Sequence, residues 1–424
     1  LNSFKKKLNQ LIKDFGITEY DGHSFIKTHK HYYSKYIDIN TAQTIASRAY
    51  KAIKLLLFDP NTKKVKFKKE LLSVEGKTNK SGIRFKNNCL YWNKLTIPAI
   101  IRKNDLYAQE CLDTGNIKYC RITKKFIKNK YKYYIQLIME GEKSVKLNKS
   151  GHSKQIYGAD KIGIDTSFQF VAVSSTSTVK LLKLGEGLNT TYRAIKLLQR
   201  KLDRQRRSNN PNKYNIDGTF KKGNRDKWIN SNKMRITQNK LKHLYGLKQR
   251  KLKQSHEKLA NYLLTLGTDV YVENINYKAL KKKIKEPKIN PKTGRFKSKK
   301  GYGKSIQNKA PALFLETLNK KLNYIGKELN NINIYTFKAS QYNHYTDTYE
   351  KKKLSERWTT INKAKIQRDL YSAFLIMNSK QDLSHTDREE CIKTFKTFKK
   401  LHKSEMKRIA NLKTIKKIPS AWGF

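Results

Sequence analysis

Apolar residues recur at helical spacing near the start of the chain. Between residues 39 and 56 they fall on one face of a helix, because they repeat about every 3.6 residues: Ile39, Ala42, Ile45, Ala46, Ala49, Ile53 and Leu56. Over residues 82–140 the pattern changes to short apolar runs, such as Cys89–Trp92 and Tyr133–Ile138, separated by turns containing Gly, Asn and Lys. Runs of this kind predict a small β-barrel or sandwich.

Short apolar runs return after a polar stretch at residues 141–159. Ile162–Ser167 and Phe168–Val173 predict a β-hairpin with Asp165 inside its first strand, and Val179–Leu184 predicts a third strand. Residues 191–265 predict long helices, interrupted near Asn209–Pro211 and Asp217–Gly218.

The last part of the chain alternates strands with helices. Strands are expected at Asp269–Glu273 and Ile332–Phe337, with a helix over residues 312–329 between them. Another apolar helix should begin near Asp369, and the last 40 residues are basic and amphipathic.

The net charge of the chain indicates what kind of molecule it binds. The chain has 424 residues, with 93 Lys and Arg against 33 Asp and Glu, a formal net charge of +60. Such a chain repels itself unless a polyanion neutralises it. The basic residues run along the whole chain rather than in one cluster beside a membrane, so nucleic acid is the expected partner, since phosphate contacts release counterions.

The cysteines bear on metal binding and on the compartment. Cys89, Cys111, Cys120 and Cys391 include no C-x-x-C pair, so neither a disulfide framework nor a zinc ribbon is supported. No apolar run approaches the roughly 18 residues of a membrane span, and no signal-peptide pattern is present. We expect free thiols in a cytoplasmic protein with no membrane partner.

Three acidic residues stand beside apolar neighbours. Asp165 lies in a strand otherwise made of Ile and Gly, Glu273 closes the strand at 270–272, and Asp369 opens an apolar helix. Carboxylates in such places are costly unless they are paired or bound to metal. Together they could hold two Mg²⁺ or Mn²⁺ ions, which favour hard oxygen ligands.

Each of these acids also has an ordinary interpretation. Asp165 fits a turn residue, Glu273 a surface charge at a strand end, and Asp369 an acid that the helix dipole favours at an N-terminus. The acids are 108 and 96 residues apart in the sequence, which says nothing about their distance in space.

The ordered set of motifs resembles a known family. The motifs are Ile162-Gly163-Ile164-Asp165 with its hairpin, Val272-Glu273-Asn274-Ile275, and Gln367-Arg368-Asp369-Leu370-Tyr371-Ser372-Ala373. They are similar to the three motifs of a split RuvC nuclease domain, and more narrowly to the TnpB family, the transposon-encoded RNA-guided nucleases related to type V CRISPR effectors. The basic segment at residues 198–207 and Ser340-Gln341-Tyr342 add to this resemblance, which covers nearly the whole chain.

The resemblance implies an α/β fold with an RNase H-like (RuvC) core, in which Asp165, Glu273 and Asp369 are the catalytic metal ligands. It also implies a guide RNA from the transposon end and a target DNA duplex next to a short flanking motif. One departure is that many relatives carry a zinc ribbon between the second and third motifs. The corresponding residues here, Tyr342–Tyr345 and Arg357–Thr360, contain no cysteine, so no zinc is expected.

We expect four regions. They are a helical recognition region at 1–80, in which part of the barrel could begin, a β-barrel or wedge domain at 81–150, a split RuvC domain at 151–385, and a basic helical tail at 386–424. The RuvC domain would contain a helical insertion at about 190–265 and a basic loop at about 281–305.

Basic residues on the predicted helices are candidates for nucleic-acid contacts. A run of charge is usually a solvated helix face, but this one has few acidic neighbours, which favours phosphate contacts. The candidates are Arg200, Lys201, Arg204, Arg206, Arg207, Arg235, Arg250 and Arg368. Trp228 and Tyr245 lie among cations and suit either base stacking or core packing, of which core packing is the preferred interpretation.

The leading hypothesis is an RNA-guided DNA endonuclease of prokaryotic cytoplasm, associated with the nucleoid when bound. Base pairing would read the target while the protein reads backbone shape and a short motif. Two alternatives remain: an RNA-guided repressor that binds DNA without cutting it, and a transposase that acts directly on transposon ends. Intact acids argue against the first, and the second would need no RNA.

Overall fold

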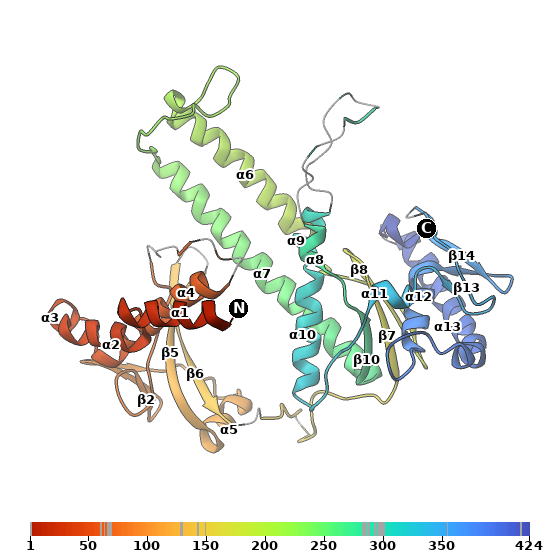
Figure 1. The fold of residues 1–424 in the computed structure, drawn as a ribbon, viewed down its shortest axis with the longest axis horizontal. Helices are drawn as coiled ribbons and strands as arrows, with labels where there is room; N and C mark the ends of the chain where they lie inside the picture. The colour runs from red at the N-terminus through yellow and green to blue at the C-terminus, as the bar shows by residue number, and fades with distance from the viewer. Residues whose placement is uncertain are drawn as a thin grey trace. The chain divides into compact units, whose positions relative to one another are not determined.

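The chain divides into two compact units, Leu1–His152 and Ser153–Phe424 (Figure 1). The computed structural model describes residues 2–59, 62, 64–65, 70–127, 130–141, 144–148, 150–281, 286, 289–291, 294, 302–353, 355–415 and 418–424. Most of the basic loop expected at 281–305 lies outside these residues, and its last part begins helix α9 (Gly303–Lys309). Within the described ranges, no helix is both long enough and apolar enough to cross a membrane.

The first unit begins with four helices, α1 (Asn2–Asp14), α2 (Glu19–Thr28), α3 (Lys30–Tyr33) and α4 (Ile39–Phe58). Asp38 caps α4 by accepting a hydrogen bond from the backbone N–H of Thr41 at 2.9 Å. The same carboxylate accepts from the indole N–H of Trp92 at 2.9 Å, so it ties the helices to the strands that follow.

The strands of the first unit form two sheets rather than a closed barrel. One sheet has the order β1 (Ser73–Glu75), β5 (Asn116–Ile127) and β6 (Lys130–Glu140); the other has the order β2 (Arg84–Lys86), β3 (Cys89–Trp92) and β4 (Leu95–Pro98). Helix α5 (Leu106–Thr114) lies between β4 and β5 in the sequence. No ladder joins the two sheets among the described residues, so, of the predicted barrel or sandwich, the barrel is not closed.

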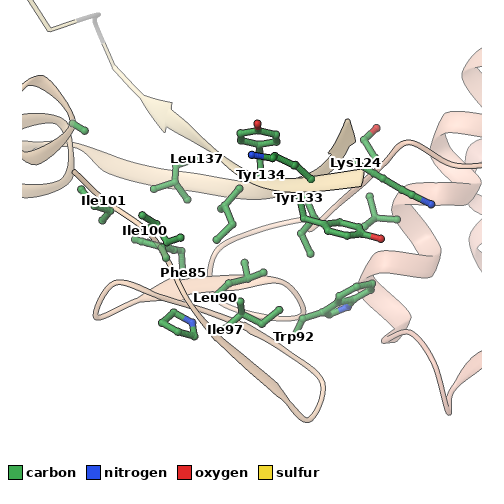
Figure 2. Close-up of a pocket in the computed structure, with 18 of the residues that line it drawn as sticks. Phe85, Leu90, Trp92, Ile97, Ile100, Ile101, Lys124, Tyr133, Tyr134 and Leu137 are labelled. Carbon is green, nitrogen blue, oxygen red and sulfur yellow. The ribbon is translucent and has the colours of Figure 1, made fainter. Parts of the chain in front are cut away.

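A side chain occupies an edge where a further strand would pair. The Asn79 amide accepts from the Phe85 N–H at 2.7 Å and donates to the Phe85 carbonyl at 3.1 Å. Because the N–H and the carbonyl of Phe85 are both bonded to this side chain, they are not available to pair with a further strand at β2. The sheets instead face each other across an apolar cavity of about 1300 Å³, with Tyr133 and Leu137 on one side and Phe85, Leu90 and Ile97 on the other (Figure 2).

The second unit is built on a mixed five-stranded sheet. Its strands are β7 (Lys161–Thr166), β8 (Phe170–Ser175), β9 (Val179–Lys183), β10 (Asp269–Glu273) and β11 (Asn330–Ile332), in the order β11-β10-β7-β8-β9. The β7–β8 and β8–β9 pairs are antiparallel, while β10 runs parallel to both β7 and β11.

Helices cover both faces of this sheet. Since side chains alternate along each strand, both faces present apolar residues for the helices to cover. On one face Ile164 and Val272 pack with α7 (Asn232–Leu266) and α10 (Pro311–Asn323). On the other, Ala172 and Tyr271 share a core with α12 (Arg368–Met377) and α13 (Arg388–Ile415). The basic region at 386–424 therefore shares its core with the residues before it.

Helix α12 lies directly against β7 at Gly163. A Cβ atom at this position would overlap the carbonyl oxygen of Ala373 and the backbone nitrogen of Met377. The glycine of the Ile162-Gly163-Ile164-Asp165 motif is thus required by the close approach of a helix backbone to the sheet.

Two further features lie around the core. Helix α6 (Asn189–Asn209) pairs with α7 as a long hairpin (Figure 1), joined through the 3₁₀ turn η1 (Pro211–Lys213). The predicted strand at 332–337 is wrong, because Asn333 caps helix α11 (Ile334–Phe337) by accepting from the Tyr335 N–H at 2.9 Å.

The remaining elements are short. Helix α8 (Tyr277–Leu280) follows β10, and two hairpins precede α12. The hairpins consist of β12 (Tyr342–Asn343) with β13 (Thr348–Tyr349), and β14 (Trp358–Ile361) with β15 (Ala364–Gln367). The 3₁₀ turn η2 (Ser420–Trp422) lies near the C-terminus.

Candidate functional site

The carboxyl ends of β7 and β10 bring two acids to one edge of the sheet. Val272 pairs with Ile164 in the parallel ladder, so the next residues, Glu273 and Asp165, follow side by side. Ile164 and Val272 face α7 and α10. Because the direction of side chains alternates along a strand, Asp165 and Glu273 face the side of the sheet that α12 covers.

Asp369 reaches the same side from the first turn of α12, where its side chain is buried. Gln367 fixes both the helix end and this carboxylate. Its side-chain oxygen accepts from the Leu370 N–H at 2.8 Å, and its side-chain nitrogen donates to Asp369 Oδ2 at 2.9 Å. An acid in the first turn is also favoured by the helix dipole.

Two arginines stand beside Asp369. Arg357 Nη1 lies 3.8 Å from Asp369 Oδ2, and Arg368 Nη2 lies 3.7 Å from Asp369 Oδ1. Arg368 also donates to the Lys353 carbonyl at 3.1 Å, and only 11% of its side chain is exposed. Arg368, expected as a nucleic-acid contact, is thus placed within the acidic site, apart from the other seven candidates.

Burial and neighbouring charge affect the protonation of Asp165 and Glu273. Burial raises the pKa of Asp165 well above its usual range, and the negative charges of Glu273 and Asp369 raise it further. The charges of Arg368 and Arg357 act in the opposite direction. Burial also raises the pKa of Glu273 to about 7. The site therefore disfavours the ionised form of Asp165, and the two arginines offset this effect only in part.

A tyrosine and a threonine border the acids. The hydroxyls of Thr166 and Tyr277 are 2.7 Å apart, and both residues are buried. Burial raises the pKa of Tyr277 to about 12, to which the charges of Asp165 and Glu273 contribute. Tyr277 is therefore neutral at physiological pH.

The donor chemistry of this site fits a divalent cation of the Mg²⁺ type. Its three carboxylates offer hard oxygen ligands, and their mutual repulsion would be relieved by positive charge. Among the described residues, however, no group of three or more His, Cys, Asp or Glu side chains is arranged to hold a metal ion. Mg²⁺ is commonly held by one or two carboxylates together with substrate phosphates and water.

The other predicted nucleic-acid contacts lie on α6 and α7. Arg206 is partly buried, and the remaining six are exposed: Arg200, Lys201, Arg204, Arg207, Arg235 and Arg250. The preference for core packing at Trp228 and Tyr245 is wrong, since their exposed fractions are 46% and 41%. The α6–α7 hairpin extends from the sheet (Figure 1), so Trp228 and Tyr245 have little hydrophobic core to pack against.

The segment around Tyr342–Tyr345, where no zinc is expected, is packed around an imidazole. His344 is fully buried, and its Nδ1 lies 2.7 Å from the hydroxyl of Tyr371 on α12. Burial, aided by the charge of Arg388, lowers the pKa of His344 to about 4. All four cysteines are free.

Two neighbours of Asp369, Gln367 and Arg357, were not predicted from the sequence. Gln367 belongs to a quoted motif, and its place just before an apolar helix is the signal that marks it as a cap. Arg357 carries no such signal, because its approach to Asp369 depends on the β14–β15 hairpin returning the chain to α12.

Comparisons with solved structures give several distant likenesses, of which two follow. A cryo-EM structure of the Cas12f1–sgRNA–target DNA complex matches with a TM-score of 0.41 and 13% identity, over 80% of this chain and 70% of that chain. A CRISPR-Cas12f ternary complex matches with a TM-score of 0.27 and 12% identity, over 90% and 82%. At these TM-scores, neither likeness establishes a shared fold. None of the protein-family models matches the chain, and no curated protein does either.

Proposed function

We propose that this protein is an RNA-guided, metal-dependent DNA endonuclease. The observation that carries the proposal is the meeting of three acids from distant parts of the sequence at one edge of the sheet. Asp165 responds to the charge of both Glu273 and Asp369, and buried like charges are unfavourable unless a cation or a proton compensates them. Strongly perturbed pKa values of this kind cluster at functional sites.

The surrounding fold suits this function. The sheet has the strand order β11-β10-β7-β8-β9. Its acids lie on β7 and β10, the first and fourth of these strands in sequence order, and on α12, which follows the fifth. This arrangement fits an RNase H-like (RuvC) core. The resemblance to TnpB proteins supports the same assignment. That the nuclease derives from a transposon, and takes its guide from the transposon end, is the finer part of the proposal.

Asp165, Glu273 and Asp369 would hold Mg²⁺ or Mn²⁺. When bound, such ions activate water and stabilise the leaving oxygen in phosphodiester hydrolysis. Gln367 holds Asp369 in position, and Arg357 and Arg368 keep positive charge beside it. Arg357, whose side chain is 30% exposed, can also meet a DNA phosphate.

The charge of the chain suits a guide RNA and a target duplex together. A net charge of +60 can accept many phosphates, and the exposed basic residues of α6 and α7 supply part of that charge. Sequence choice would then come from base pairing with the guide.

The test compares Asp165→Ala and Glu273→Gln with the wild type on DNA that matches the bound RNA. Both variants should retain RNA binding and lose Mg²⁺-dependent cleavage by about a thousandfold or more, as expected when an essential ligand is removed. Asp269→Asn is the matched control. It changes an acid at the opposite end of the same β10 strand, where Asp269 accepts from Asn330 Nδ2 at 2.9 Å, and should cut normally.

Three results would contradict the proposal. Asp165→Ala cutting at the wild-type rate would remove the acids from the mechanism. Guided binding without any cutting by the wild type would favour an RNA-guided repressor. Strand-transfer products in a reaction free of RNA would favour a transposase.

A further inference from the structure

The loop that joins α6 to α7, residues 210–231, folds into an ordered hairpin cap. Asn210 is buried, and its side-chain nitrogen donates to the carbonyls of Arg206 and Ile229, each at 3.0 Å. Lys213 is buried too, and donates to Asn224 Oδ1 at 3.0 Å and to the Asp226 carbonyl at 2.5 Å. The hairpin cap thus holds a defined shape at the end of α6 and α7 (Figure 1).

Three aromatic rings gather on the hairpin cap. The Tyr214 and Phe220 ring centroids are 4.8 Å apart, and those of Phe220 and Trp228 are 5.8 Å apart. Phe220 is 55% exposed and Trp228 is 46% exposed. Large exposed rings on an ordered support are typical of surfaces that bind a partner.

Positive charge surrounds these rings. Residues 206–228 contain seven Lys or Arg and two Asp. Lys213 Nζ lies 4.9 Å from the Trp228 ring centre, and the guanidinium of Arg207 lies 5.3 Å from that of Tyr214. The carboxylate of Asp217, one of these two acids, accepts hydrogen bonds from the N–H and the hydroxyl of Thr219. These features favour a partner that is anionic and offers flat groups.

We propose that the hairpin cap binds unpaired nucleotides of RNA, with Trp228 and Phe220 stacking on bases and the surrounding cations contacting phosphates. Aromatic rings beside cations are the usual means of holding single-stranded nucleic acid. A duplex keeps its bases stacked inside, whereas the loops and bulges of a folded RNA expose them. This inference rests on the proposed function, because it assigns part of the guide RNA to a surface outside the acidic site.

The test measures binding of the full chain to an RNA hairpin with a loop of about eight unpaired nucleotides, within the usual range of site sizes. A fully paired RNA duplex with the same number of phosphates is the reference probe. The double variant Phe220→Ala/Trp228→Ala should bind the loop RNA about 10- to 100-fold more weakly, given the contribution of base stacking. Its affinity for the duplex should stay within about twofold, since phosphate contacts are retained.

Three control variants separate stacking from other effects. Trp228→Phe keeps a ring at this position and should retain most of the wild-type affinity, as expected if stacking is what holds the loop RNA. Ile216→Ala removes a fully exposed apolar side chain without a ring from the same cap, and should have no effect. Lys222→Ala should lower the slope of log affinity against log salt by about one, whereas the double variant should leave that slope unchanged.

Equal binding of the loop RNA by the wild type and the double variant would overturn the inference and assign the rings to another class of partner. An equal loss on single-stranded DNA of the same loop sequence, with no preference for RNA, would overturn the choice of RNA. These outcomes are distinct from failure of the proposed function, because the double variant keeps every acid of the site. A wild type that binds the loop RNA through the cap but never cuts DNA would refute only the nuclease.

Discussion

At the scale of single residues, Gly163 shows how the sequence constrains the site. The backbone of α12 occupies the space that a side chain there would need. Gly163→Ala should therefore lower the free energy of unfolding by about 1–3 kcal/mol or more, as overpacking does. Gly246→Ala is the control, since a Cβ in the middle of α7 would meet only the end of Arg250, at 3.4 Å. That change should stabilise the chain by about 0.5–1 kcal/mol. Chemical denaturation of both variants tests whether their changes in unfolding free energy have opposite signs.

Gln367 should affect cleavage more than stability. Gln367→Ala removes both the cap of α12 and the hydrogen bond to Asp369. The loss of a cap should cost about 1 kcal/mol of unfolding free energy, while the cleavage rate should fall at least tenfold because Asp369 is no longer oriented. Asn333→Ala, which removes the cap of α11, should leave the rate unchanged. Equal rates for both variants would show that Gln367 acts only as a cap.

The sequence predicts the elements that carry the acids better than the contacts around them. The strand expected at Asp269–Glu273 has those bounds in the structure, and a helix begins at Arg368, close to the expected start. Both follow from local apolar patterns. The roles of Asp165, Glu273 and Asp369 as metal ligands stay a prediction. The approach of Arg357 to Asp369 depends on tertiary folding, which no local pattern encodes.

At the scale of elements, α13 supports the acidic site through a neutral imidazole. The Gln367 N–H donates to Nε2 of His402 at 3.1 Å, which requires that nitrogen to be unprotonated. Burial lowers the pKa of His402 from 6.5 to about 4. Between these pH values the unfolded chain binds a proton that the folded chain does not, so this residue's contribution to stability is lost as the pH falls.

His402→Gln isolates that contribution, because glutamine can accept the same hydrogen bond without titrating. The difference in unfolding free energy between wild type and variant should shrink by about 1.4 kcal/mol per pH unit as the pH falls from 6.5 toward 4. Denaturant unfolding at several pH values measures this difference, and all other titrating groups cancel. A constant difference would mean that folding does not lower the pKa of His402.

The mistaken element predictions have local causes. The expected strand at 332–337 is apolar, but Asn333 interrupts it and begins a helix. The expected barrel has the right kind of strands, yet β2, β3 and β4 contain only three or four residues each, and Asn79 satisfies Phe85 at the edge of β2. Side chains that replace backbone partners are not visible in a pattern of apolar residues.

At the scale of the whole molecule, charge should dominate affinity. With a net charge of +60, RNA binding should weaken about 10³- to 10⁵-fold between low and moderately high salt, as expected for six to ten phosphate contacts. A filter-binding or fluorescence titration across a salt series measures the slope. A slope near zero would contradict a phosphate-dominated interface.

The most direct test of the account is to purify the protein with the RNA that it binds in the cell, sequence that RNA, and supply Mg²⁺ and DNA that matches one end of it. We predict a single abundant RNA ending in sequence from beside the gene. The matched DNA should be cut, mismatched DNA should not, and Asp165→Ala should bind the same RNA without cutting. Random RNA that salt removes, with no cleavage of any matched DNA, would contradict the account.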